Sequence, residues 1–435
     1  MKTEKILAAS GTNLLTRRSF AKPILVQKYG GSSVATADLI KNVARRVVAR
    51  HREGKAVVVV VSAMGKTTDS LIKLSKEITQ HPQRREMDML LHAGEIISTA
   101  LVAMAIAELG IPSVSFTGQQ AGMRTDSSHT EARILGVDGV RILEELGSGK
   151  IVVIAGFQGI TEDLQITTLG RGGSDTSAVA IAVGIGADEC EILTDVDGVY
   201  TADPRIVEKP LKMSWCSYDE MLELAILGAK VLHSRSVEIA RRFDVPVLVA
   251  TSYRDAPGTV ICSPEKASKE FRIMEEVSVR GIAHQKNVAK ISLVDVPDQP
   301  GVAAKVFSTI GKQDINIHLI VQAEHRGGKN DISFLVGGDK LPLVRQILGD
   351  LVQLVSGARA VVDENVATVS LVGEGVQREP GIAARMFTTL ANAGINIDLI
   401  STSNLMLTCV IPEDRAEDGV RALHQEFFEK SSTGD

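Results

Sequence analysis

The 435-residue chain is too long for one ordinary hydrophobic core, and its length predicts two or three domains. Its composition, 44% hydrophobic and 23% charged, is that of a soluble globular protein. The net charge of −5, without a basic stripe, excludes nucleic acid as the main partner. The longest apolar runs, such as Ala56 to Val61, are far shorter than the roughly 20 residues that span a bilayer, so no membrane is expected as a partner.

Cysteine usage and the N-terminal residues bear on the compartment. The four cysteines lie far apart without a Cys-x-x-Cys pair, so the sequence suggests neither a zinc ribbon nor a disulfide framework. This cysteine usage fits a reducing cytoplasm. Residues 1–22 contain Arg17-Arg18 but no signal-peptide core, and they are expected to form a flexible extension, with organellar targeting as the alternative. We therefore expect a cytoplasmic protein, and we assign no residue as a metal ligand.

Short β-branched runs alternate with helix-patterned segments over the first 250 residues. This alternation predicts an α/β fold with a buried, largely parallel sheet. Ligands of such folds gather at the carboxyl ends of the strands. The expected strands are Ile24 to Gln27, Ala56 to Val61, Ser113 to Phe116, Ile151 to Ala155, Glu191 to Leu193 and Pro246 to Ala250, and the clearest expected helices are Ala37 to Glu53 and Arg85 to Leu109.

A cation and two glycines follow the first expected strand, in the stretch Val26-Gln27-Lys28-Tyr29-Gly30-Gly31-Ser32-Ser33. The glycines let backbone N–H groups approach an anion with no Cβ in the way, and the serines are expected to open a helix whose N-terminus favours negative charge. The stretch matches neither the Walker loop nor the dinucleotide fingerprint. It predicts a phosphate site, and the alternative is an ordinary tight turn between a strand and a helix.

Polar residues follow the second expected strand as well, in a loop that runs from Ser62 to Asp69. Their hydroxyl groups either cap the helix that follows or bind a ligand. Glu95 comes later, on an otherwise apolar helix, where a carboxylate needs a partner. It is either a helix-surface residue beside a packing glycine or a carboxylate that faces a ligand ammonium group.

A second glycine cluster, Thr167 to Ser177, mirrors the first. It follows a strand-like stretch and precedes an apolar helix expected from Ala178 to Gly184. The first cluster has a lysine, and this one adds Arg171 and Asp175. Transfer of a phosphoryl group from a polyphosphate needs positive charge on both the transferred and the leaving oxygens. The pair of clusters therefore points to such a reaction.

The stretch Thr194 to Arg205 ends another strand and offers hydroxyl, carboxylate, Tyr and Arg side chains. We interpret it as a tight turn that contacts a nucleotide. Lys230 is either a further contact at the same place or an ordinary solvated lysine. Residues 251–285, with Pro257-Gly258 and a charged run, are expected to join two domains.

An internal repeat follows. Asp298 to Ile320 and Arg378 to Ile400 match at eleven of twenty-three positions, with an offset of 80 residues. Each copy predicts a strand, a Pro-Gly turn, an amphipathic helix and a second strand opened by Ile-Asn-Ile. The turn places helix N-terminal amides where a ligand carboxylate can bind. The alternative is a module that serves dimerisation alone.

These motifs, in this order, resemble those of bacterial monofunctional aspartate kinases from about residue 24 to residue 428, and the repeat resembles their paired ACT regulatory domains. The resemblance implies an amino-acid-kinase three-layer α/β fold with a central, mainly parallel sheet and two small ferredoxin-like ACT domains (βαββαβ). It implies ATP and Mg²⁺ as cofactors, L-aspartate as acceptor and 4-phospho-L-aspartate as product, on the route to lysine, threonine, methionine and isoleucine. The motifs are Lys28 to Ser33, Ser62 to Gly65, Gly156 to Gly159, Leu169 to Asp175 and Thr194 to Arg205.

The family's site residues carry over position by position. Lys28 resembles its catalytic lysine, and Asp175 resembles the acidic residue that orients this lysine. The reacting carboxylate of aspartate has a reference pKa of about 3.9, so no general base is needed. The resemblance implies ATP contacts from Lys28, Tyr29, Gly30, Gly31, Thr194, Asp195, Tyr200, Arg205, Lys230 and Val231, and substrate contacts from Ser62, Thr68, Glu95, Arg171, Gly172, Gly173 and Ser174.

The resemblance also implies feedback inhibition by lysine, threonine or both, bound between ACT domains of a homodimer or a larger homo-oligomer. One ACT domain of the family is inserted within the other, so Val277 to His284 is expected to pair with the C-terminal unit. Asn404-Leu405-Met406 stand where the family usually has an acidic and then a basic residue, which predicts weaker or altered lysine inhibition. Effector contacts are expected from Asp298, Gly301, Asn316, Ile317, Gln322, Asn396, Ile397 and Ser403.

Five segments are expected from these arguments: an extension (1–22), a kinase domain (23–262), a linker with a shared strand (263–285) and two ACT domains (286–362 and 363–435). Three rival functions remain. A kinase of glutamate or N-acetylglutamate is disfavoured by the Arg171 cluster and the two ACT units. A catalytically silent regulatory subunit is disfavoured because all the matched catalytic positions are present, and a bifunctional kinase–dehydrogenase is disfavoured by length.

Overall fold

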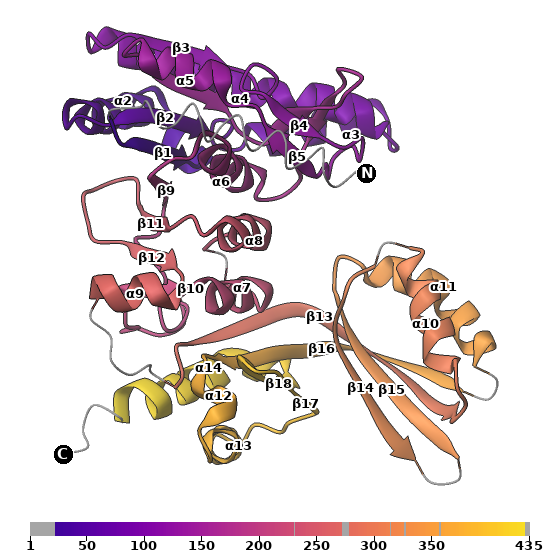
Figure 1. The fold of residues 1–435 in the computed structure, drawn as a ribbon. Helices are drawn as coiled ribbons and strands as arrows, with labels where there is room; N and C mark the ends of the chain where they lie inside the picture. The colour runs from indigo at the N-terminus through magenta and orange to yellow at the C-terminus, as the bar shows by residue number, and fades with distance from the viewer. Residues whose placement is uncertain are drawn as a thin grey trace, which may run out of the picture. The chain divides into compact units, whose positions relative to one another are not determined.

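The computed structural model describes residues 22–229, 231–271, 278–313, 315–325, 328–355 and 358–430. The described residues fall into two compact units, and most of their helices and strands are labelled in Figure 1. The first unit contains residues 22–199, 212–225 and 231–271. The second contains residues 200–211, 226–229 and the described residues from 278 onward.

The first unit is built on an eight-stranded sheet in the order β10-β12-β11-β9-β1-β2-β6-β3. The neighbours β11, β9, β1, β2, β6 and β3 run parallel, and β12 is antiparallel to β11. A smaller sheet has the order β5-β4-β7-β8. The strands are β1 (Ile24–Tyr29), β2 (Ala56–Val61), β3 (Ser113–Phe116), β4 (Met123–Thr125), β5 (Ile134–Val137), β6 (Ile151–Ala155), β7 (Gln158–Ile160), β8 (Ile166–Thr168), β9 (Glu189–Thr194), β10 (Trp215–Ser217), β11 (Val247–Thr251) and β12 (Thr259–Cys262).

Helices cover both faces of the large sheet. Helices α2 and α4 pack against the face to which Tyr29, Val57 and Val59 point, and α6, buried on nearly all sides, packs against β1, β2 and β9. Continuous apolar strands such as β2 are expected when a parallel sheet is covered twice. The helices are η1 (Gly31–Val34), α2 (Ala37–Arg52), α3 (Thr67–Ile78), α4 (Arg84–Glu108), α5 (Val140–Gly147), α6 (Gly173–Ile185), α7 (Tyr218–Ile226), α8 (Ser234–Phe243) and α9 (Pro264–Phe271).

Among the described residues, α4 is the one helix long and apolar enough to cross a membrane by length and composition. A buried core helix of a globular domain passes the same test. Two carboxylates of α4, Asp88 and Glu95, are buried and bond to loops of the first unit. The helix is therefore part of the core of this unit.

The second unit contains a six-stranded antiparallel sheet in the order β14-β15-β13-β16-β18-β17. Its two longest strands, β13 and β16, pair at the centre, so each contributes to both halves of the sheet. The elements are β13 (Gly281–Pro297), α10 (Val302–Gly311), β14 (Ile317–His325), β15 (Lys329–Gly337), α11 (Leu341–Leu354), β16 (Arg359–Val372), α12 (Gly375–Arg378), α13 (Ile382–Asn392), β17 (Leu399–Thr402), β18 (Met406–Pro412), η2 (Glu413–Arg415), α14 (Ala416–His424) and η3 (Gln425–Glu429).

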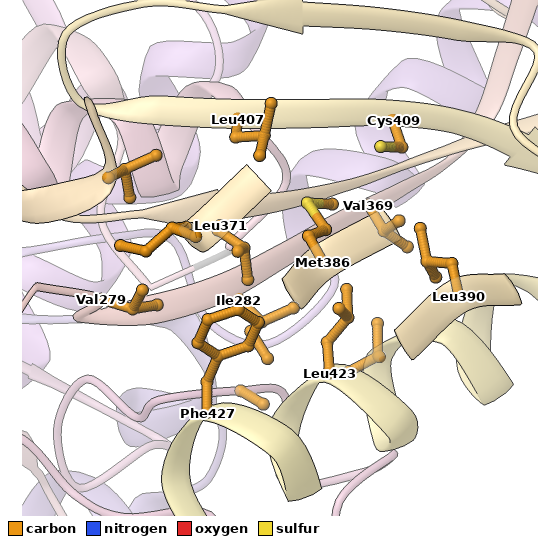
Figure 2. Packing of buried hydrophobic residues seen from close by; sticks show 14 of the residues in the cluster. Val279, Ile282, Val369, Leu371, Met386, Leu390, Leu407, Cys409, Leu423 and Phe427 are labelled. Carbon is orange, nitrogen blue, oxygen red and sulfur yellow. The ribbon is translucent and has the colours of Figure 1, made fainter. Parts of the chain in front are cut away.

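Each half of this sheet carries its own hydrophobic core. In one half, α10 and α11 pack on the sheet around Phe334. In the other, Met386 and Leu390 of α13 lie with Leu423 of α14 against Val369 of β16, as Figure 2 shows. The core of this second half also includes Ala202 and Val207 from the short segment 200–211.

The predicted α/β fold with a mainly parallel sheet is confirmed, and every expected strand of the first unit is present. The segment expected to pair with the C-terminal unit is described from Ser278 onward, and Gly281 to His284 lie opposite Val369 to Val372. The expected extension, residues 1–22, lies outside the described residues except for Lys22. All four cysteines are buried thiols that form no disulfide with one another.

The helix expected from Ala37 to Glu53 is confirmed as α2, which follows Thr36, whose hydroxyl accepts from the Leu39 N–H. The serines before it open only the short 3-10 helix η1. Two local predictions were wrong. The apolar helix expected from Ala178 begins at Gly173, because the glycine cluster itself supplies the first turn of α6. In the second repeat, the strand β17 begins after the Ile-Asn-Ile segment rather than within it.

Candidate active site

The motifs singled out in the sequence meet at one edge of the large sheet. Strands β1, β2, β6 and β9 run parallel, so their carboxyl ends lie on the same side. The first glycine pair follows β1, Ser62 follows β2, Gly156 follows β6, and Asp195 follows β9. This edge is where ligands of open α/β sheets bind.

At the end of β1, Lys28 is 8% exposed and forms an ion pair with Asp175 of α6, with 2.6 Å between Nζ and Oδ1. The adjacent strand residue Tyr29 points to the opposite face of the sheet, into the α2 and α4 layer. Lys28 is thereby directed to the face that α6 covers. Gly31 is required by close approach, because a Cβ there would lie 2.7 Å from the Ala63 carbonyl oxygen.

Glu95 lies on α4 and is 3% exposed. Its Oε1 atom accepts a hydrogen bond from the Ala63 N–H at 3.1 Å, whereas its buried Oε2 atom has no partner among the described residues. Burial raises the pKa of Glu95 from its ordinary value of 4.5 to about 7, although the Ala63 N–H lowers it in part. The alternative of a helix-surface glutamate was therefore wrong, and this carboxylate needs a cation or a proton.

The Ser62 loop joins these two features. Ala63 binds Glu95, and the Gly65 N–H donates to the Gly31 carbonyl at 3.0 Å. The alternative that its hydroxyls cap α3 was wrong, because no side chain caps this helix; Thr67 instead donates to the Met64 carbonyl. Thr68, in the first turn of α3, is half-buried.

The second glycine cluster places α6 beside β1 and beside Gly156, the residue that follows β6. Gly172 adopts a left-handed backbone (φ 66°), and a Cβ there would lie 2.2 Å from the ring of His233. Gly173 and Ser174 are buried in the first turn of α6, and a Cβ on Gly156 would lie 2.9 Å from the Ser174 Cβ. Asp175 follows in the same turn and reaches Lys28.

Arg171 stands apart from this buried group. Its side chain is exposed and makes no hydrogen bond or ion pair with any of the described residues. The structure therefore places the backbone of its loop beside the site but leaves the guanidinium available to a ligand.

Residues 23–251 match the Amino acid kinase family, and residues 291–353 and 369–427 match ACT domains. An aspartokinase of Mycolicibacterium smegmatis is 48% identical over 407 residues, which are 93% of this chain and 96% of that protein. The chain belongs to the aspartokinase family. It is accordingly an aspartate kinase with ACT regulatory domains.

Solved structures agree with the aspartokinase assignment. E. coli aspartokinase III in complex with aspartate and ADP (R-state) has a TM-score of 0.79 at 26% identity, and the match covers 93% of this chain and all (100%) of that one. The same enzyme in complex with lysine and aspartate (T-state) has a TM-score of 0.72, with 93% and 99% covered. These ligands are properties of that enzyme.

The residues predicted to contact the nucleotide belong to both units of this aspartokinase. Thr194 and Asp195 lie at the end of β9, where the Thr194 hydroxyl donates to Asp195 at 3.0 Å. Tyr200 and Arg205 belong to the segment 200–211, which groups with the second unit, and Arg205 is paired with Asp203 at 2.6 Å. Val231 is half-buried after β10 and α7, and Lys230 lies outside the described residues.

The expected effector residues lie in the second unit. Asp298 accepts from the Asn330 amide at 2.9 Å, and Gly301 precedes α10. Asn316, Gln322 and Asn396 are exposed, and Ile317 and Ile397 are half-buried. Ser403, half-buried, forms the tight turn between β17 and β18, in which its N–H donates to the Met406 carbonyl at 2.9 Å. The unusual Asn404-Leu405-Met406 segment is this turn.

Two residues at the aspartokinase site were not predicted from the sequence. The His233 ring packs on Gly172, and burial lowers the pKa of this histidine while the Asp175 carboxylate raises it in part. No local sequence pattern predicts this contact between His233 and Gly172. Asp88 is buried on α4 seven residues before Glu95, and two acids on one face of an apolar helix were a signal that could have been used.

Proposed function

We propose that the chain transfers the γ-phosphoryl group of ATP to the side-chain carboxylate of L-aspartate and yields 4-phospho-L-aspartate and ADP. One observation carries the proposal: a buried lysine paired with the half-buried Asp175 and a buried, half-satisfied glutamate lie at the same sheet edge. The first suits a transferred phosphoryl group and the second suits a substrate ammonium group.

Lys28 acts as the catalytic cation in this proposal. Its ammonium group stabilises the charge on the γ-phosphoryl oxygens as the bond to ADP loosens. Asp175 holds Lys28 in place and keeps its charge compensated when no substrate is bound. The Gly31 N–H is proposed to approach the same phosphates, whereas the Gly30 N–H donates to the Leu193 carbonyl at 3.4 Å.

L-aspartate is held by charge at both ends of its backbone. Glu95 takes the ammonium group, and Arg171 binds a carboxylate bidentately because its guanidinium has no other partner among the described residues. Ser62, Thr68 and the Gly172-Gly173-Ser174 turn complete the proposed contacts. The acceptor carboxylate is already ionised at neutral pH, so the site needs no general base.

ATP is proposed to contact Lys28, Gly30, Gly31 and the further residues named for it above, with Tyr29 contributing through its backbone alone because its side chain is fully buried on the opposite face of the sheet. The complex of E. coli aspartokinase III with ADP supports this proposal. The described residues contain no cluster of three metal-ligating side chains. Mg²⁺ is commonly held by one or two carboxylates together with substrate phosphates. Asp195, exposed at the end of β9, is the carboxylate suited to it. Bound there, the ion would neutralise phosphate oxygens.

Regulation is proposed to act through the second unit, with lysine, threonine or both as effectors. ACT domains and the lysine complex of E. coli aspartokinase III support this. Homo-oligomerisation is supported by the two edge strands, β14 and β17, which carry Ile320 and Ile400, 52% and 45% exposed, at equivalent repeat positions. Such edges are ready to pair with another copy.

The remaining proposals concern domains, pathway and location. We propose the segments 1–22, 23–262, 263–285, 286–362 and 363–435 as expected from the sequence. We place the reaction at the start of the route to lysine, threonine, methionine and isoleucine. A cytoplasmic location is supported by the four buried cysteines, which remain thiols as expected in a reducing compartment.

The test is ADP release by the purified protein with Mg-ATP and L-aspartate, with L-glutamate and N-acetyl-L-glutamate as controls. We expect turnover with L-aspartate alone. Turnover with either control, and none with L-aspartate, would contradict the proposed acceptor.

Titration with lysine and threonine, singly and together, tests the regulation. We expect suppression by at least one of them and only weak or altered inhibition by lysine, because Asn404-Leu405-Met406 lacks the charges usual in the family. Potent inhibition by lysine alone would refute the second expectation. Unchanged turnover with both amino acids would refute the first and leave the repeat a role in assembly.

A further inference from the structure

The loop that carries Arg171 is held from behind by a buried carboxylate. Asp88, on α4, is fully buried and accepts from the Thr168 hydroxyl at 2.5 Å and from the Thr130 N–H at 3.0 Å. His129 lies 2.7 Å from the same carboxylate. Thr130 adopts a left-handed backbone (φ 73°), which is unfavourable for a β-branched residue and is maintained here by these bonds.

The same loop is held a second time by a cation. Arg235, half-buried on α8, donates to the Leu169 carbonyl at 2.5 Å and to the Ala132 carbonyl at 2.8 Å. It makes no ion pair with a carboxylate of the described residues, and these two carbonyl oxygens are its hydrogen-bond partners. An arginine fork that joins two backbone segments fixes their separation and their direction.

Asp88 and Arg235 bind the same pair of backbone segments. The Ala132 N–H donates to the Thr168 carbonyl at 2.9 Å, and a Cβ on Gly170 would lie 3.1 Å from the Thr130 carbonyl oxygen. The segment 129–133 therefore runs directly beside 168–170, the residues that precede Arg171. Asp88 fixes one end of this contact and Arg235 fixes the other.

Resting on the proposed function of Arg171, we propose that Arg235 is a positioning residue for L-aspartate, which sets the backbone from which Arg171 reaches the substrate. Arg171 is exposed and without a partner in the described residues, so its direction depends on its own backbone. A long side chain on a loose loop would lose conformational entropy when it binds, and a fixed loop reduces that loss. Asp88 serves the same loop from α4, two helical turns before Glu95.

The proposal makes a selective kinetic prediction. Arg235→Met should raise the KM for L-aspartate about tenfold, which corresponds to roughly 1.4 kcal/mol, and leave the KM for ATP within about twofold. Arg235→Lys, which can reach only one of the two carbonyls, should give an intermediate rise of about threefold. The matched control is Arg241→Met on the same helix, since Arg241 pairs with Asp219 on the surface. It should change neither KM.

The experiment is a double-mutant cycle on the full chain that crosses Arg235→Met with Arg171→Ala, with equilibrium binding of L-aspartate measured beside the kinetics. If Arg235 acts through Arg171, Arg235→Met adds less than about twofold in the Arg171→Ala background. Additive effects, an unchanged KM for L-aspartate, or an equal rise in the KM for ATP would overturn the proposal. If thermal melting shows that Arg235→Met is unfolded, Arg235→Lys takes its place in the cycle.

The cycle also separates the two levels of the argument. If Arg171→Ala alone leaves the KM for L-aspartate unchanged, the proposed role of Arg171 is wrong, and the positioning inference falls with it. If Arg171→Ala raises that KM and the Arg235 variants do not, only the positioning inference is wrong.

Discussion

The phosphate end and the aspartate end of the candidate site differ in whether their charged groups have a partner. At one end, Lys28 and Asp175 lie 2.6 Å apart and compensate each other. At the other, Glu95 is more deeply buried, but one of its oxygens has no partner in the described part of the chain. A lone buried carboxylate is costly, and it responds by binding a proton or a cation.

This difference separates the two tasks of a kinase. The phosphate end must present positive charge at the moment of transfer, so its cation is held ready by a fixed partner. The aspartate end must favour a substrate with an ammonium group, so its anion is left incomplete until that group arrives. We therefore expect changes at the first end to act on turnover and changes at the second to act on aspartate affinity.

The largest expected effect is on turnover. Lys28→Ala removes the cation and leaves Asp175 without its ion-pair partner, so kcat should fall at least about tenfold, the effect of losing ~1.4 kcal/mol of transition-state stabilisation. Steady-state ADP release measures it. Lys41→Ala, an exposed lysine on α2, is the control and should keep full turnover. A Lys28→Ala enzyme with wild-type kcat would refute the catalytic role.

The next effect is on aspartate binding. Glu95→Gln keeps an acceptor for the Ala63 N–H but removes the negative charge, so the KM for L-aspartate should rise roughly tenfold to 100-fold, as expected for a charged hydrogen bond of about 1.5–3 kcal/mol. The KM for ATP should not change. Glu108→Gln, exposed at the end of the same helix, is the control. A parallel rise in both KM values would break the division between the ends.

The same variant should alter the pH dependence of stability. The pKa of Glu95 is raised from 4.5 to about 7 in the folded chain, so its contribution to stability is fully present below the unfolded pKa and is lost as the pH rises through 7. At pH 8, Glu95→Gln should therefore have a larger free energy of unfolding than the wild type, by at most roughly 3 kcal/mol. Near pH 4.5 the two proteins should be equally stable. Thermal melting without ligand across this range measures it, and a pH-independent difference would contradict the raised pKa.

The smallest expected effect concerns the glycine turn at the start of α6, which contributes to both the phosphate end and the aspartate end of the site. Gly172→Ala forces a left-handed backbone on alanine and brings a Cβ to 2.2 Å from the His233 ring. We expect a loss of about 1–3 kcal/mol in the free energy of unfolding. Because α6 carries both Ser174 and Asp175, kcat and the KM for L-aspartate should change together. Denaturant unfolding and kinetics of the same preparation test this, and wild-type values in both would contradict it.

The sequence predicted the phosphate end better than the aspartate end. Lys28, Gly30 and Gly31 follow an apolar strand, and a local pattern of strand, cation and glycine is sufficient to predict a phosphate turn. The opposing Asp175 was singled out because a second glycine cluster surrounds it. The start of α6 was placed five residues late, because glycines usually indicate loops rather than the first turn of a buried helix.

Burial and long-range contacts could not be read from the pattern. Whether Glu95 faced solvent or the interior was undecided, since the answer depends on the Ser62 loop some thirty residues earlier in the chain. Asp88 and Arg235 bond to segments 42 and 103 residues away, respectively, and no spacing rule connects them. His233 became visible only through its contact with Gly172.

The most direct test of the two-ended site is proton release on binding of L-aspartate, measured by titration calorimetry near pH 7 in buffers of different ionisation enthalpy. Free Glu95, with a pKa of about 7, is partly protonated and must lose that proton to bind the ammonium group. We predict net release of a fraction of a proton from the wild type and none from Glu95→Gln. Binding without proton release by the wild type would contradict the account.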